Sequence, residues 1–303
     1  MGAMRLSILL LACAAAAPAQ SQRAVLFGID GLGSKGLAEA RTPNIDTLRR
    51  QGEWTLRARG VMPTSSSPNW ASMIMGAGPE QHGVTSNDWK PERFDIAPVC
   101  TGRAGIFPTV YGILRDQRPK AVIATFAEWE DYDRLVERGV ANVMGHPEAS
   151  RKDNQEPFKA AGQTIAMALE FLRTRKPDLL FIHLDLVDHA GHRFGHLTPE
   201  YVAAVEEADR LVGMVVAALR ESDGARPVLL LTADHGGVGK KHGGATMAEI
   251  EIPWIVEGPG IARGREIKVP VNTYDTAPTL ARLLGINPHS CWIGKVVEEA
   301  IVP

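Results

Sequence analysis

Acidic and histidine side chains gather in four short motifs of this 303-residue sequence. One aspartate closes an apolar run near the N-terminus, a D-x-x-x-H motif lies in the second half, and Asp-His and His-Gly-Gly motifs follow it. Together they contribute three carboxylates and three imidazoles: Asp30, Asp188, His192, Asp234, His235 and His242. Such a mixture favours zinc or manganese over calcium or magnesium, which prefer oxygen ligands. Because six ligands exceed what one catalytic zinc needs, the set predicts two divalent ions in a shared site.

Each motif taken alone has an ordinary structural explanation. An aspartate at the end of a strand usually caps a turn, and His242 by itself is compatible with a surface loop. Asp185 and His189 repeat the spacing of the D-x-x-x-H motif and compete with it. The Asp234-His235 pair is more informative, because two polar groups directly after an apolar run are costly in a core without partners. The joint occurrence of the motifs, in this order and at predicted strand ends, is what indicates a site.

Apolar runs and helical periodicities alternate along the chain and position these motifs. We expect strands at residues 23–30, 55–61, 120–125, 178–185, 227–234 and 252–256, and helices at residues 43–51, 70–75, 110–116, 157–174, 199–220 and 276–285. This alternation predicts an α/β fold with a mostly parallel central sheet and helices on both faces. The polar motifs follow strand ends, which form the edge where such sheets bind ligands.

The composition is that of an ordinary globular protein, with 45% hydrophobic and 22% charged residues. A net charge of −2 without long basic runs argues against bulk nucleic-acid binding, so we expect a small-molecule partner held by a local site. After the N-terminal run, no stretch is long and apolar enough to predict a transmembrane helix. The oligomeric state leaves no signal in the sequence.

Residues 1–19 predict a signal peptide. A basic residue precedes the apolar run at residues 6–17, and residues 17–19 form an A-x-A pattern typical of a cleavage site. The run is too short to cross a bilayer, and a lipid anchor at Cys13 is less favoured. We therefore expect an exported protein, periplasmic or secreted, in which residues 20–303 form a single domain.

Two cysteines, Cys100 and Cys291, lie beyond the predicted signal peptide. Export permits a disulfide between them, and two small buried thiols are the alternative. Neither cysteine shows a spacing typical of metal sites.

Six motifs resemble those of the alkaline phosphatase superfamily, most closely its nucleotide pyrophosphatase/phosphodiesterase branch. They are GIDG at residues 28–31, MPTSSSPNW at 62–70, EQHGVTSN at 80–87, DHAGHRFG at 188–195, TADHGG at 232–237, and HGG at 242–244 followed by IPWIVEGPG. The segment YDTAPTLARLLG also resembles the last helix of that superfamily, so the resemblance spans about residue 25 to the end of the chain. The resemblance implies an alkaline-phosphatase-like fold and an exported two-metal phosphoric ester hydrolase of the type I phosphodiesterase kind, with residues 20–303 as a single metallohydrolase catalytic domain.

The resemblance also assigns roles. Ser66, two residues before the Pro68-Asn69 pair, falls on the nucleophile that becomes phosphorylated, and Asn87 falls on the amide that contacts the phosphoryl group. A serine hydroxyl is a weak nucleophile unless a metal or base activates it. One ion would be held by Asp30, Ser66, Asp234 and His235, and a second by Asp188, His192 and His242. Contiguous hydroxyl residues make Ser65 the next candidate nucleophile.

The chain departs from many relatives just before His242, where it lacks the long insertion that contributes to a cap. We therefore expect no large cap insertion and a more open site. The segments at residues 89–108 and 129–157 are then the candidates for selecting the substrate.

The substrate class follows from the charges near Ser66. A phosphomonoester dianion needs extra positive charge, and no arginine or lysine stands at a family position there. Lys240, Lys241 and Arg193 flank the metal motifs, but such residues are usually solvated surface charges. We therefore favour phosphodiester or pyrophosphate substrates, with a phosphomonoesterase or a sulfatase as same-fold alternatives. Trp70 replaces the arginine of the sulfatase pattern. A catalytically inactive metal- or ligand-binding protein is the alternative of another class.

Overall fold

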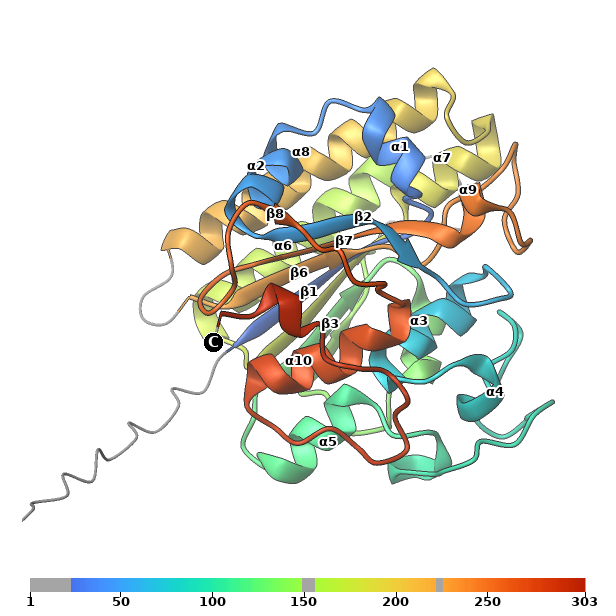
Figure 1. The fold of residues 1–303 in the computed structure, drawn as a ribbon, viewed down its shortest axis with the longest axis vertical. Helices are drawn as coiled ribbons and strands as arrows, with labels where there is room; N and C mark the ends of the chain where they lie inside the picture. Colours follow the sequence, from blue (N-terminus) through green and yellow to red (C-terminus); the bar gives the residue numbers. More distant parts are fainter. Residues whose placement is uncertain (1–22, 149–155, 222–225, 303) are drawn as a thin grey trace, which may run out of the picture.

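A mixed β-sheet forms the centre of the protein (Figure 1). The computed structural model describes residues 23–148, 156–221 and 226–302, and within them the sheet has eight strands in the order β4-β3-β5-β1-β6-β7-β2-β8. The strands are β1 (Ala24–Ile29), β2 (Glu53–Arg59), β3 (Ile123–Ala127), β4 (Val143–Gly145), β5 (Leu179–Leu184), β6 (Val228–Thr232), β7 (Glu251–Glu257) and β8 (Arg265–Glu266). The predicted signal peptide, with Cys13, lies outside the described residues.

Most neighbouring strands run parallel, which confirms the predicted sheet. Strand β1 pairs in parallel with β5 and β6, and β3 pairs in parallel with β4 and β5. The exception is β7, which runs antiparallel to both β6 and β2. Every residue of β1, β5 and β6 is buried. Strands covered on both faces need apolar side chains on both, which explains the continuous aliphatic runs in the sequence.

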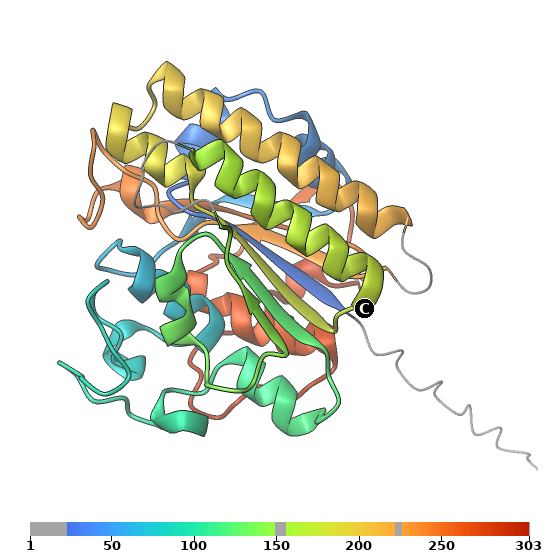
Figure 2. The same ribbon diagram turned by 180° about the vertical axis from the view of Figure 1, so that it is seen from behind.

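Helices cover both faces of the sheet, as predicted (Figure 1, Figure 2). One face carries α1 (Ser34–Glu39), α2 (Pro43–Gln51), α6 (Pro157–Arg175), α7 (Leu186–Phe194) and α8 (Pro199–Glu221). The other carries α3 (Ser66–Met75), α4 (Pro79–His82), α5 (Val110–Gln117) and α10 (Thr276–Leu284), while the short α9 (Met247–Ile250) leads into β7. Short 3₁₀ turns include η1 (Arg103–Gly105), η2 (Glu130–Leu135), η4 (Thr273–Asp275) and η5 (Glu298–Ala300). In the part of the chain that is described, no helix has the length and apolar character that a membrane span requires.

The predicted elements are present, with boundaries shifted by a few residues, and the differences have local causes. The helix predicted at residues 70–75 begins earlier because Ser65 adopts the extended N-cap conformation and Ser66 opens α3. Thr42 occupies the N-cap position of α2, but its side chain makes no capping hydrogen bond. The sequence does not predict α7, because its polar motif hides the helical periodicity. Strands β4 and β8 are too short to produce a recognisable hydrophobic pattern in the sequence.

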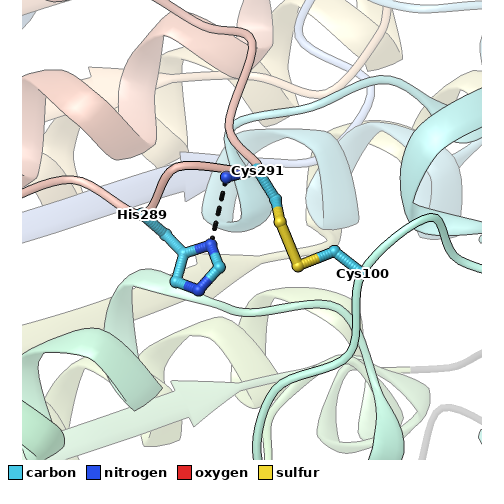
Figure 3. Close-up of side chains that lie close together, drawn as sticks. All are labelled: Cys100, His289 and Cys291. Atoms are coloured by element: carbon cyan, nitrogen blue, oxygen red, sulfur yellow. Dashed lines mark hydrogen bonds between the residues drawn. A yellow bond between two sulfur atoms is a disulfide. The ribbon is translucent and has the colours of Figure 1, made fainter.

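The structure pairs Cys100 with Cys291 in a disulfide, which answers the question that the sequence left open (Figure 3). Their Cα atoms lie 6.4 Å apart although 191 positions separate them in the sequence. The Cys291 backbone N–H also donates to Nδ1 of His289 at 3.2 Å (Figure 3). The bond therefore fastens the long loop after α4 to the segment that follows α10.

Candidate functional site

Three adjacent parallel strands deliver candidate ligands to one edge of the sheet. Asp30 follows β1, Asp188 lies in the helix after β5, and Asp234 follows β6. Because β5 and β6 flank β1, the carboxyl ends of all three strands meet there. Gly31 has a φ of +71°, and a Cβ at this position would lie 2.7 Å from Cα of Asp188. Glycine therefore lets the end of β1 approach α7 closely.

The Asp30 carboxylate is buried and held by two donors. Nε1 of Trp70 and Nε2 of His183 both donate to Oδ2, each at 3.1 Å. Burial opposes ionisation, but the hydrogen bonds from His183 and Trp70 help to outweigh it, so the pKa of Asp30 lies well below its ordinary value. The other oxygen, Oδ1, is buried without a hydrogen-bond partner. Asp30 therefore presents an ionised, unsatisfied oxygen to the site.

Asp234, His235 and Ser66 surround the same point. The backbone N–H groups of Gly31 and His235 donate to Asp234 Oδ1 at 3.1 and 2.9 Å. Nδ1 of His235 donates to the carbonyl of the next residue at 3.0 Å, so the neutral ring carries a lone pair on Nε2. That nitrogen lies 3.2 Å from Asp234 Oδ2, 3.4 Å from Ser66 Oγ and 3.6 Å from Asp30 Oδ1. Burial lowers the pKa of His235 to about 4, which keeps the lone pair available.

Asp188, His192 and His242 form a second cluster. Nδ1 of His192 donates to the Lys240 carbonyl at 3.0 Å, and Nδ1 of His242 donates to the Thr64 carbonyl at 2.9 Å. The two Nε2 atoms then face each other at 3.1 Å. Asp188 places Oδ2 3.1 Å from His192 Nε2 and Oδ1 3.9 Å from His242 Nε2. The hydrogen bond with Asp188 raises the pKa of His192 to about 9, the response of an imidazole in surroundings that attract positive charge.

The donor chemistry of both clusters fits divalent cations. Oδ1 of Asp30, Oδ1 of Asp188 and Oδ2 of Asp234 are buried without hydrogen-bond partners, a costly state that a cation would relieve. The rings of His235 and His242 stack with centroids 3.8 Å apart, so the two clusters are neighbours. Potential ligand atoms lie within 4.8 Å of one another in two sets: Asp188, His192 and His242, and Asp30, Asp188 and His235.

Hydrogen bonds tie the loop before Ser66 to the loop of His242. Oγ1 of Thr64 donates to the Gly244 carbonyl at 2.7 Å and accepts from the Gly243 N–H at 3.1 Å. On the other side, the buried Glu249 accepts from the Gly244 N–H at 2.8 Å. Three hydrogen bonds from two residues thus fix the two glycines that follow His242, a candidate ligand.

Ser66 opens α3 and points its hydroxyl at the first cluster, 3.4 Å from His235 Nε2. Asn69 fixes the preceding turn, because its Oδ1 accepts from the Val61 N–H at 2.7 Å and its Nδ2 donates to the Ser65 carbonyl at 3.0 Å. The N-terminus of a helix carries partial positive charge, which favours an anion or alkoxide at this position.

Asn87 lies against the first turn of α3. Its Oδ1 accepts from the Ser67 N–H at 2.8 Å, which leaves the amide nitrogen to act as a donor. Nη2 of Arg134, in η2, donates to the Asn87 carbonyl at 2.9 Å and pairs with Asp131 at 2.9 Å. Sequence reasoning did not identify Arg134, because it lies 47 residues from Asn87 and in no recognisable motif.

Other supporting residues also differ from the sequence interpretation. The sequence motifs single out neither Trp70 nor His183 as a partner of Asp30, yet both donate to its carboxylate and both are fully buried. A single polar residue inside an apolar strand was the available signal for His183. Lys240 contributes its carbonyl to orienting His192, and its side chain is exposed.

Comparison with known proteins matches most of this chain to one family. A family model described as type I phosphodiesterase / nucleotide pyrophosphatase matches residues 24–242. The chain is similar to venom phosphodiesterase 2 of Crotalus adamanteus, with 25% identity over 217 residues that cover 70% of this chain and 26% of that protein. It is also similar to ectonucleotide pyrophosphatase/phosphodiesterase family member 1 of Mus musculus, with 26% identity over 273 residues, 84% of this chain and 29% of that protein. The match therefore spans less than a third of either relative.

Solved structures share the fold. Murine ectonucleotide pyrophosphatase/phosphodiesterase 5 superposes with a TM-score of 0.69 at 15% identity, covering 88% of this chain and 96% of that chain. Wild-type alkaline phosphatase PafA gives a TM-score of 0.73 at 13% identity, covering 93% and 99%. A 2-O GAG sulfatase gives 0.70 at 17% identity, covering 91% and 73%. The α/β fold is thus alkaline-phosphatase-like, and the fold alone does not select among these esters.

Proposed function

The chain belongs to the type I phosphodiesterase/nucleotide pyrophosphatase family within the alkaline phosphatase superfamily, and from this premise we propose a metal-dependent phosphoric ester hydrolase with Ser66 as its nucleophile. The observation that carries the proposal is one hydroxyl beside a buried cluster rich in carboxylates: Ser66 Oγ lies 3.4 Å from His235 Nε2, which in turn faces oxygens of Asp30 and Asp234 that have no hydrogen-bond partner. A protein that only binds ligands has no need of a hydroxyl at this point.

The two clusters would hold the ions in the arrangement that the family resemblance implies. Asp30, Ser66, Asp234 and His235 would bind one ion, and Asp188, His192 and His242 the other. When bound, two divalent ions, zinc or manganese by the mixed donor set, would lower the pKa of the Ser66 hydroxyl and stabilise negative charge on the leaving oxygen.

The chain's own residues supply the remaining chemistry. Ser66 attacks phosphorus, the bond to the leaving alcohol breaks, and water later cleaves the phosphoserine to restore the hydroxyl. The Asn87 amide, oriented by its bond to the Ser67 N–H, donates to a non-bridging phosphoryl oxygen. The positive end of α3 favours the same anion. Ser65 is the weaker candidate nucleophile because it occupies the N-cap position before the helix.

We propose phosphodiester or pyrophosphate substrates of small size. A phosphomonoester dianion needs an additional positive group near its oxygens. Arg134 is bonded to Asn87, but its guanidinium is engaged by the Asn87 carbonyl and by Asp131. A diester, with a single negative charge at phosphorus, needs no further cation at this position.

We also propose that residues 20–303 act as one catalytic domain in an exported protein. The Cys100–Cys291 disulfide supports export, because such bonds persist in oxidising compartments. The named relatives include a venom enzyme and an ectoenzyme, which agrees with this placement.

Substitution of the nucleophile provides the direct test. We expect Ser66→Ala to lower turnover of bis-p-nitrophenyl phosphate by on the order of 10³-fold or more while the protein stays folded and retains bound metal. Ser65→Ala is the matched control and should keep most of the activity. Full activity in Ser66→Ala, or loss confined to Ser65→Ala, would assign the nucleophile elsewhere.

A parallel comparison tests the substrate class. The wild-type protein, supplied with zinc or manganese, is assayed on bis-p-nitrophenyl phosphate, p-nitrophenyl phosphate and p-nitrophenyl sulfate. We expect the diester to give the highest kcat/KM. A higher kcat/KM for the monoester or the sulfate would contradict the proposed substrate class. Bound metal without turnover of any ester would favour a binding protein.

A further inference from the structure

A cavity of about 680 Å³ lies beside the candidate site, between the two segments that the sequence singles out for substrate selection. One wall comes from the loop after Asn87, with Lys90 and Glu92, and the other from η2 and the residues after it, with Arg134 and Arg138. Residues 90–106 and 133–144, which belong to these two segments, therefore meet at one concave surface.

The cavity adjoins the reacting centre through two hydrogen bonds. Arg134, in the cavity wall, donates to the Asn87 carbonyl at 2.9 Å, and the Asn87 side chain accepts from the Ser67 N–H at 2.8 Å. Lys90 follows Asn87 by three residues, so their Cα atoms are at most about 11 Å apart. Through these contacts the cavity wall adjoins Asn87, the proposed phosphoryl contact.

The charges in this cavity are not balanced. Arg134 is paired with Asp131, and Asp133, also in the wall, is paired with His146 at 3.0 Å. Among the described residues, no ion pair engages Lys90 or Arg138, and both are exposed. Glu92 is the one lining carboxylate that opposes them. With Glu92 opposing two cations, one positive charge stands in excess, and a guanidinium matches the paired oxygens of a carboxylate or phosphate.

The remaining lining residues argue against an aromatic ligand group. They include Ile106, Val136 and Met144, and within the described chain no aromatic side chain lines the cavity. A flat ring system would find no stacking partner here, whereas an aliphatic linker would find apolar contacts.

We infer that this cavity binds a second anionic group on the substrate, so that the preferred substrates are phosphodiesters or pyrophosphates whose organic part ends in a carboxylate or phosphate. The inference rests on the proposed phosphodiesterase function and adds the chemistry of the group beyond the reacting phosphate. Arg138 and Lys90 are the anchoring residues, and Arg134 links their wall to Asn87.

Matched synthetic diesters test the inference. Each probe carries p-nitrophenol as the leaving group and an alkyl chain of three or six carbons that ends in either a carboxylate or a primary amide, which differ in charge but little in shape. We expect kcat/KM to be about tenfold higher for the carboxylate than for the amide at one of the two chain lengths, with the preference falling as salt increases. Equal kcat/KM for both end groups at both lengths would overturn the inference.

Substitutions in and near the cavity wall test which residues produce the preference for the carboxylate probe. Arg138→Ala should reduce the carboxylate-to-amide ratio by most of that factor, Lys90→Ala should reduce it partly, and Arg138→Lys should restore part of it. Arg93→Ala is the matched control, because Arg93 lies on the same loop but does not line the cavity. An unchanged ratio in Arg138→Ala, or an equal drop in Arg93→Ala, would contradict the assignment.

Binding measurements separate this inference from the proposed function. Isothermal titration of the same probes into Ser66→Ala should show tighter binding of the carboxylate than of the amide. If the wild-type protein hydrolyses neither probe but Ser66→Ala still prefers the carboxylate, the proposed function fails and the anion cavity stands. If the wild-type protein hydrolyses both probes without preference, the inference fails and the proposed function stands.

Discussion

Asp234 shows at the scale of one residue why this site is suited to cations. It is completely buried, and one of its oxygens has no hydrogen-bond partner. Burial, together with the charges of Asp30 and Asp188, raises its pKa well above the ordinary value. Three carboxylates so close together repel one another, and divalent ions would remove that repulsion.

Removal of the Asp234 carboxylate should therefore lower metal content. We expect Asp234→Ala to bind at least one ion fewer per chain than the wild-type protein, measured by mass spectrometry of the metals after dialysis. Asp209→Asn is the control, since Asp209 is a buried carboxylate of α8 that accepts from the N–H groups of Asn44 and Ile45 and belongs to neither candidate ligand cluster. Full retention of two ions in Asp234→Ala would refute its ligand role.

Helices and loops place residues that strands alone could not bring together. Helix α7 puts Asp188 and His192 four positions apart on one face, where their side chains meet at 3.1 Å. The competing Asp185 sits at the N-cap of this helix, and it belongs to neither set of neighbouring ligand atoms at the site among the described residues. The structure groups Asp188 and His192, and not the alternative pair, with His242.

Helix α4 is fastened to α3 by a buried histidine with a pH-dependent contribution. His82 accepts from the Val84 N–H through Nδ1 at 3.0 Å, and its Nε2 lies 3.0 Å from Ser72 Oγ. Burial lowers the pKa of His82 from 6.5 to about 3. Below pH 6.5 the unfolded chain binds a proton that the folded protein does not, so stability is lost as the pH falls toward 3.

His82→Gln should flatten this dependence. Between about pH 6 and 4, the free energy of unfolding of the wild-type protein should fall more steeply than that of the variant, by up to about 1.4 kcal/mol per pH unit. Denaturant titrations at several pH values measure the two slopes. Ser72→Ala should lower stability at every pH but retain the wild-type slope, since the imidazole stays buried. Equal slopes for wild type and His82→Gln would contradict the prediction.

At the scale of the whole molecule, the disulfide closes a very long loop. Cys100 and Cys291 are separated by 191 positions, so the bond restricts the unfolded chain over most of its length. It also fastens the segment that leads from Cys100 to the cavity wall at Ala104 and Ile106.

Cys100→Ser should lower the free energy of unfolding by about 2–5 kcal/mol, measured by denaturant titration. Cys291→Ser should have the same effect, and the double substitution should cost little more than either single one. Reducing agent should destabilise the wild-type protein and leave the double variant unchanged. Full additivity of the two single substitutions would show that the cysteines act separately.

Much of the fold was predictable because it depends on local patterns. The aliphatic runs of β1, β5 and β6 predict buried parallel strands, and the polar motifs at their ends indicate a site at the edge of the sheet. The residue types alone indicated a mixed zinc or manganese donor set. The roles of Ser66 and Asn87 as nucleophile and phosphoryl contact stay predictions.

The tertiary structure decided what depends on contacts between distant segments. It paired Cys100 with Cys291, brought Arg134 to the Asn87 carbonyl, and turned Thr64 toward the glycines beside His242. It also joined two separate loops into one cavity. The physical reason is that hydrophobic periodicity and secondary-structure propensity depend on a few neighbouring residues. These contacts arise only when helices pack on both faces of the sheet and the loops between them meet.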